Sequence, residues 1–376
     1  MNRLKFLLVP GLAFWLIACK DPYKPDLISS SKSYLVVEGI LNAGTGPTTI
    51  HLSRSFKLDD SATVRGELNA TVMVEGKDNI VRHLMMTGDG IYTSDNLGLA
   101  INGEYRLRIN TTDGKEYLSD YVVAKSTPPI DSLSFEQNDK GVEVQVSTHD
   151  PTNNTRYYLW NFDETWEIWS FFFSFYKFEN DQVVLRGPGD EVSTCWKYDF
   201  SNSILIGSSA SLQADAIYRA PLIFLPNGDE KLTVRYSILA RQYALDKRAY
   251  EFYEMMRKNT ESLGSIFDAQ PSEIRGNIHN TADPGELVIG YVSACDIAEK
   301  RFFISKTQIR DWYYYQQCDE TKISNDIDSV RHAYTIGYSI YDAVFMGPFI
   351  VGYKVALEPC VDCRRRGGSL ARPSYW

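Results

Sequence analysis

Residues suited to metal or nucleophilic chemistry are few and scattered in this sequence of 376 residues. The five histidines stand singly: His51, His83, His149, His279 and His332. No H-E-x-x-H metal motif, G-x-S-x-G nucleophile motif or Walker phosphate loop occurs, and Gly187-Pro-Gly189 is typical of a turn. We therefore expect no catalytic site, metal or cofactor. Hydrolysis stays open as an alternative, because the two carboxylates of a glycosidase need only meet in space.

Positive charge is also scarce. The 39 lysines and arginines are outnumbered by 48 acidic residues, which gives a net charge of −9 at pH 7. The one basic run, Arg364-Arg365-Arg366, is short and suits a solvated loop. The sequence therefore lacks the basic footprint of a nucleic-acid-binding protein, and we expect no nucleic-acid partner.

Long apolar runs are missing except near the start of the chain. Arg3 and Lys5 precede the apolar run 6–17, which ends at Ala18-Cys19. This pattern predicts a secretory signal peptide over residues 1–18, because the run is shorter than the roughly 20 residues of a membrane-spanning helix. Small or apolar residues before a cysteine favour acylation of the Cys19 thiol and cleavage in front of it. An ordinary secretory leader that happens to end near a cysteine is the alternative.

The segment after the expected lipidation site is polar. Residues 19–33 contain two prolines and several serines, a composition typical of an extended tether. We therefore expect the folded body to stand off the membrane.

Five cysteines remain if Cys19 is acylated. Their odd number leaves one free thiol, and Cys295, in an apolar stretch, is the candidate for a buried one. The other four could form one or two disulfides in an exported protein, with a connectivity that the sequence leaves open: Cys195, Cys318, Cys360 and Cys363. The C-x-x-C spacing of Cys360 and Cys363 has no second cysteine or histidine pair nearby, so a metal or redox site is not favoured.

Short alternating runs dominate residues 34–126. Tyr105, Leu107 and Ile109 alternate with charged residues, which predicts a strand with one buried face. About six or seven such strands separated by turns favour an immunoglobulin-like β-sandwich. Thr127-Pro-Pro is a stiff break, and we place a domain boundary there.

A second β-rich, sandwich-like domain is expected over residues 130–357. Alternating runs recur at 142–146 and 231–239. Apolar residues then follow a helical spacing, which predicts an amphipathic helix over 240–263, before the stop at Gly264. Residues 358–376 form a cysteine-containing C-terminal tail. The predicted fold class is therefore mainly β.

Aromatic residues are dense between positions 166 and 178. Trp166, Trp169 and Tyr176 are the candidates for aromatic contacts to a ligand such as a glycan. Burial inside the second sandwich is the alternative that we favour, because packing is the commoner fate of such rings.

Several segments together resemble the Bacteroidota lipoprotein family known as domain of unknown function 4249. They include Tyr34–Gly39, Gly103–Leu107, Asp113–Tyr117, Pro129–Ser132, Gly264–Asp268, Cys360–Arg364 and Pro373–Trp376. The family tends to end in Pro-Asp-Phe-Trp, whereas this chain has Pro-Ser-Tyr-Trp. The resemblance implies no established activity. Because the genes of such proteins commonly neighbour those of TonB-dependent receptors, it implies an accessory component of an import or assembly complex.

These observations predict a non-catalytic outer-membrane lipoprotein. Its expected partners are the membrane, through a lipid anchor at Cys19, an outer-membrane β-barrel receptor, and a small nutrient or glycan. Lys20 rather than aspartate follows Cys19, which favours outer-membrane delivery, and Lys20-Asp21 partly resembles a surface-export signal, which favours the cell surface over the periplasmic face. A surface protein that binds or cleaves glycans through exposed aromatics is one alternative, and a purely structural or adhesive sandwich is another.

Overall fold

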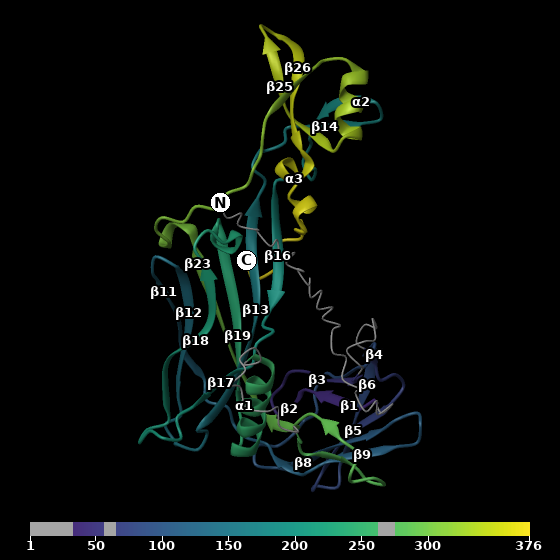
Figure 1. Cartoon of the computed structure of the whole chain (residues 1–376), viewed down its shortest axis with the longest axis vertical. Coiled ribbons are helices and arrows are strands. Elements are labelled where there is room, and N and C mark those ends of the chain that lie inside the picture. The colour runs from purple at the N-terminus through teal and green to yellow at the C-terminus, as the bar shows by residue number, and fades with distance from the viewer. Residues whose placement is uncertain (1–32, 56–64, 262–274) are drawn as a thin grey trace, which may run out of the picture. The chain divides into compact units, whose positions relative to one another are not determined.

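The computed structural model describes residues 33–55, 65–261 and 275–376 (Figure 1). The predicted signal peptide, Cys19 and most of the tether lie outside the described residues. Strands dominate the part that is described, which confirms the prediction of a mainly β protein. Within it, no helix is both long and apolar enough to cross a membrane.

The first sheet links eleven strands of the described residues in the order β20-β9-β8-β5-β6-β7-β3-β1-β21, with β10 beside β8 and β4 beside β3. Its strands are β1 (Leu35–Glu38), β3 (Thr48–Arg54), β4 (Arg65–Gly66), β5 (Thr71–Gly76), β6 (Val81–Gly88), β7 (Ile91–Ser94), β8 (Glu104–Asn110), β9 (Glu116–Ser119), β10 (Val122–Val123), β20 (Ile278–Asn280) and β21 (Val288–Ile289). The predicted alternation of β8 is observed, because Tyr105, Leu107 and Ile109 are buried. They share one core with Leu35 and Val288, which are cross-strand partners on β1 and β21 at the far end of the sheet.

Strands from far along the chain complete this N-terminal part. β21 pairs in parallel with β1, and β20 pairs with β9. The short strand β22 (Ser293–Cys295) pairs in parallel with β2 (Ile40–Asn42). The sequence prediction assigned residues 278–295 to the second domain, whereas their strands pair with β1, β2 and β9. Strands of two or three residues are too short to show an alternation that sequence reading could detect.

Two facing sheets enclose the second core. One contains β16 (Thr194–Phe200), β13 (Tyr157–Trp169), β19 (Arg235–Ala244) and β23 (Ile297–Ser305), with β17 (Leu205–Ser208) beside β13. The other contains β11 (Ile130–Gln137), β12 (Gly141–His149) and β18 (Ala216–Pro226). The short 3-10 helices η1 (Glu230–Leu232) and η2 (Lys306–Gln308) lie at the ends of β19 and β23. Val144 of one sheet and Tyr236 of the other are fully buried in the same core, as in a sandwich.

The amphipathic helix is present as α1 (Lys247–Glu261), but the predicted start at residue 240 was wrong. Residues up to Ala244 continue β19 instead. The side chain of Asp246 accepts a hydrogen bond from the backbone N–H of Ala249, as a helix-capping residue does. The predicted apolar positions Ala249 and Phe252 are buried against Tyr291. The cap at Asp246 was the signal that could have placed the start correctly.

A third core lies within the region that the sequence prediction treated as one domain. It is built by β24 (Thr321–Ser324), α2 (Ile327–Thr335), β25 (Tyr338–Met346), β26 (Phe349–Leu357) and the hairpin β14 (Tyr176–Glu179) and β15 (Gln182–Leu185). Figure 1 shows β14 beside β25 and α2. Helices α3 (Glu358–Val361) and η3 (Cys363–Arg366) follow β26. The prediction missed this core because the β14–β15 hairpin precedes β24, the next element of the core, by more than a hundred residues.

Candidate binding surface

The four cysteines whose pairing the sequence left open form two disulfides in the structure. Cys195 on β16 is bonded to Cys363, and Cys318 is bonded to Cys360. Cys295 is free and buried. Each cysteine of the C-x-x-C motif is therefore joined to a distant partner rather than to the other, so the motif is a crosslink between segments.

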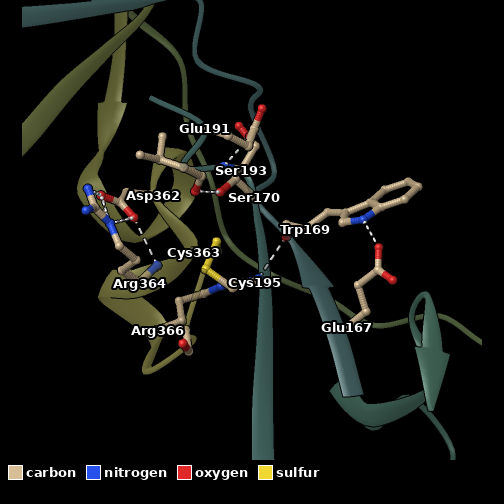
Figure 2. Close-up of a disulfide and its surroundings, with 12 residues drawn as sticks. Glu167, Trp169, Ser170, Glu191, Ser193, Cys195, Asp362, Cys363, Arg364 and Arg366 are labelled. Atoms are coloured by element: carbon tan, nitrogen blue, oxygen red, sulfur yellow. Dashed lines mark hydrogen bonds and ion pairs between the residues drawn. A yellow bond between two sulfur atoms is a disulfide. The ribbon is translucent and has the colours of Figure 1, made fainter. Parts of the chain in front are cut away.

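Hydrogen bonds around the Cys195–Cys363 bridge hold the end of β13 (Figure 2). The backbone N–H of Cys363 donates to the carbonyl oxygen of Val192 at 2.9 Å, and the Arg366 guanidinium donates to the carbonyl oxygen of Trp169 at 2.8 Å. Burial raises the pKa of Asp362, but hydrogen bonds from Arg364 outweigh it and hold that pKa below its usual range. The charged Asp362 carboxylate thereby fixes the turn that carries the bridge.

The C-terminal tail packs against the outer face of the β13–β19–β23 sheet. Trp376 donates from its indole nitrogen to Glu167 at 2.9 Å. The Arg235 guanidinium lies 4.2 Å from the ring centre of Phe303 and 5.3 Å from that of Trp376, so it contacts both rings. The predicted tail 358–376 is therefore part of the folded body.

Four aromatic side chains project from the last residue of β13 and from the segment that follows it. We call Trp169, Phe171, Phe173 and Phe175 the aromatic strip; each is between 47 and 59% exposed. Phe172, between them, points inward. Groups of exposed apolar side chains are commonly found at interaction sites, so the strip is a candidate binding surface.

The backbone of the aromatic strip is held by hydrogen bonds to two other segments of the chain. The N–H of Phe172 donates to the carbonyl oxygen of Cys360, and the N–H of Phe175 donates to that of Tyr341. The rings of Phe172 and Tyr341 stack with their centres 4.3 Å apart. The strip is therefore attached to the disulfide-linked segment and to β25, which gives its backbone a defined position.

The other two predicted ligand aromatics are engaged in packing. Trp166 is 8% exposed, and the Lys231 ammonium group lies 4.9 Å from its ring centre. Tyr176 is half-buried and meets the edge of Tyr353 in the third core. The structure thus leaves only Trp169 of the three at the surface, and adds the three phenylalanines that the prediction did not select. Their every-second-residue spacing was the available signal.

Charged groups around Glu164, in the middle of β13, are satisfied by one another. Glu164 is 2% exposed, accepts a hydrogen bond from the Tyr236 hydroxyl at 2.6 Å, and forms an ion pair with Lys231 at 2.7 Å. Lys231 also lies 3.4 Å from Asp199. Burial and the adjacent Glu164 carboxylate raise the pKa of Tyr236 well above its usual value. The arrangement stabilises the sandwich, because a carboxylate so enclosed cannot reach a substrate.

Two cavities are large enough for a small ligand, with volumes of about 750 and 860 Å³. In the first, Lys125 donates to the carbonyl oxygen of Leu245 at 3.0 Å, and burial lowers the pKa of Lys125. In the second, Arg241 lies between Asp163 and Glu299. Among the described residues, no group of three or more histidine, cysteine or acidic side chains is placed to hold a metal.

Comparison with known proteins identifies one family. The sequence matches the family described as Domain of unknown function (DUF4249) over residues 20–301, whereas no curated protein matches it. The match includes the first sheet, most of the second sandwich and Trp169. The predicted membership of domain of unknown function 4249 is confirmed, and the chain belongs to this family; the resembling segments Cys360–Arg364 and Pro373–Trp376 lie outside the matched residues.

Proposed function

We propose that this protein is an outer-membrane lipoprotein, acylated at Cys19, that works by binding rather than by catalysis. Its partner in this proposal is a TonB-dependent β-barrel receptor, in nutrient uptake or envelope assembly. The leader that ends at Cys19 supports export. Two disulfides support an oxidising compartment, because such bonds are rare in the cytosol.

The aromatic strip is the observation that carries the proposal. Its rings are exposed, while its backbone is hydrogen-bonded to segments that a disulfide crosslinks. A segment whose backbone is already hydrogen-bonded loses less conformational entropy on binding than a free loop, and aromatic residues dominate the energetics of protein interfaces. The strip therefore has the properties of a preformed contact surface for another protein.

A pull-down from detergent-solubilised outer membranes tests the partner. The tagged full-length protein should recover a β-barrel receptor, and Phe173→Ser should lower that recovery about tenfold, since a lost aromatic contact costs about 1–2 kcal/mol or more at an interface. Phe224→Ser is the matched control, because Phe224 on β18 is 46% exposed, much like Phe173 at 47%. Recovery of no barrel, or equal losses in both variants, would contradict the proposal.

The lipid anchor has its own test. Metabolic labelling with a fatty acid should label the wild-type protein and not Cys19→Ser. Cys295→Ser should stay labelled, because that thiol is buried. An unlabelled wild-type protein would exclude the anchor independently of the receptor.

Glycan binding is the second candidate, and one observation favours it. Trp169 is half-exposed, and the Glu167 carboxylate accepts hydrogen bonds from its indole at 2.7 Å and from that of Trp376. A ring beside a carboxylate can stack on a sugar and accept a hydroxyl hydrogen bond. Titration with oligosaccharides should then change the tryptophan fluorescence of the wild type and not of Trp169→Ala. An unchanged wild-type signal counts against this candidate.

A further inference from the structure

The tip of the β25–β26 hairpin is apolar without interruption. Residues 343–352 read Ala-Val-Phe-Met-Gly-Pro-Phe-Ile-Val-Gly, with no charged side chain. Gly347 supplies the positive φ of +63° at the turn. Phe345, Met346 and Phe349 are 57, 70 and 72% exposed. Turns that face water are normally polar, so this tip (residues 343–352, Figure 1) is built for another environment.

Apolar side chains emerge on both faces of the hairpin. Met346 is the cross-strand partner of Phe349, and Phe345 is the partner of Ile350. Consecutive residues of a strand point to opposite faces, so these two pairs lie on opposite sides. A flat protein surface would cover one side only. A fluid apolar phase would surround both.

The length of the apolar tip also fits a membrane interface. Its lower boundary is the ion pair between Asp342 and Lys354, which are cross-strand partners 3.2 Å apart. Ala343 to Met346 spans about 10 Å at roughly 3.4 Å per residue. Interfacial segments bury their apolar faces by about 5–10 Å. Exposed Asn325 lies beside Ile350 and Val351, with the exposed Asp326 next to it in the chain, so insertion would stop at that level and leave the ion pair outside the apolar layer.

The backbone of β26 in the tip is largely satisfied. Asn325 donates from its side-chain amide to the carbonyl oxygen of Ile350 at 3.0 Å and from its backbone N–H to that of Val351. The inner edge of β26 bonds to β25. The paired backbone groups of β26 would therefore keep their partners in an apolar phase, whereas β25 is the edge strand and its outer backbone groups need the water of the interface.

We propose that the tip of the β25–β26 hairpin inserts into the interface of a phospholipid bilayer. This contact goes beyond the proposed receptor binding. It is separate from the expected anchor at Cys19 and requires no partner protein.

A fluorescent probe at the tip tests the insertion. The full-length protein with Met346→Cys, labelled with an environment-sensitive dye, is reconstituted into vesicles of phosphatidylethanolamine and phosphatidylglycerol. The endogenous Cys295 stays unlabelled under native conditions, because it is buried and burial raises its pKa to about 12. The emission should shift to the blue, and lipids that carry a shallow nitroxide quencher should quench it.

The control places the same dye at Asp139→Cys, in the polar turn between β11 and β12, where neither effect is expected. Adding Phe349→Ser to the labelled protein should lower the inserted fraction about tenfold, because burial of a phenylalanine ring is lost. Phe349 is so exposed that the fold should persist, which an unchanged unfolding midpoint would verify.

The absence of lipid quenching at position 346 would overturn the proposal. A blue shift that appears only when a partner protein is added would also overturn it, in favour of a protein pocket. Both results are independent of the receptor pull-down, so failure of one proposal is distinguishable from failure of the other.

Discussion

Replacing Cys195 and Cys363 together with alanine is expected to lower the free energy of unfolding by about 5 kcal/mol. The bridge joins residues 168 positions apart, and the intact Cys318–Cys360 bridge bypasses 42 of them. The chain-entropy relation for the remaining loop gives the figure of about 5 kcal/mol. Both cysteines are fully buried, so solvation of the bridge changes little in the native state.

The inner bridge provides the comparison. Removing Cys318 and Cys360 opens a loop of 42 residues, for which the same relation gives about 4 kcal/mol. Guanidinium unfolding followed by tryptophan fluorescence should therefore rank the outer pair as more destabilising than the inner pair. Cys295→Ala, which removes a buried thiol but no crosslink, should cost only about 1 kcal/mol. An outer-pair variant as stable as Cys295→Ala would refute the reasoning.

Three further changes are expected to alter stability. Gly368→Ala would place its Cβ atom 2.5 Å from the Cβ atom of Cys195, so thermal unfolding should show a loss of about 1–3 kcal/mol in the free energy of unfolding. An unchanged unfolding midpoint would mean that the tail can move away. Glu164→Ala leaves Lys231 without its buried partner and should cost about 3–5 kcal/mol by chemical unfolding, whereas a loss below about 1 kcal/mol would show the pair to be dispensable. Asp150 has a pKa of about 2, because hydrogen bonds from three residues of the following loop outweigh the burial that raises it. The contribution of the charged carboxylate to the free energy of unfolding is complete above the unfolded-state pKa of about 3.9 and is lost as the pH falls towards 2. Asp150→Asn should therefore flatten the pH dependence of the unfolding midpoint in that window. A slope equal to that of the wild type would show that this carboxylate is not involved.

The sequence predicted those parts of the fold whose signals are local. Strand β8 was recognisable because Tyr105, Leu107 and Ile109 alternate with charged residues over seven positions. Helix α1 was recognisable from its apolar spacing, but its start was not, since β19 also carries apolar residues up to Ala244. A stretch whose apolar residues fit both the strand period and the helix period becomes a strand or a helix according to the strands beside it.

The parts that were not predicted depend on contacts between distant residues. Tyr176 was expected in the second sandwich or in a ligand site, yet it packs against Tyr353, 177 positions away, in the third core. The partner of Cys363 likewise depends on how β16 meets the tail, and the partner of Cys360 depends on how the segment before β24 meets α3. The sequence did show that aromatic residues are dense at the candidate site, between positions 166 and 178. Which rings face water was not, because exposure is decided by the packing of Phe172 and Trp166.

The pairing of β1 with β21 and of β9 with β20 sets the order in which the chain can mature. Residues 34–126 leave the ribosome some 150 positions before their partner strands, a lag on the order of ten seconds at ordinary synthesis rates. During that interval both edges of the nascent sheet are open to other chains. A fragment that ends at residue 126 would keep those edges permanently, so we expect it to aggregate. The first hundred residues must therefore be shielded until the last quarter of the protein arrives.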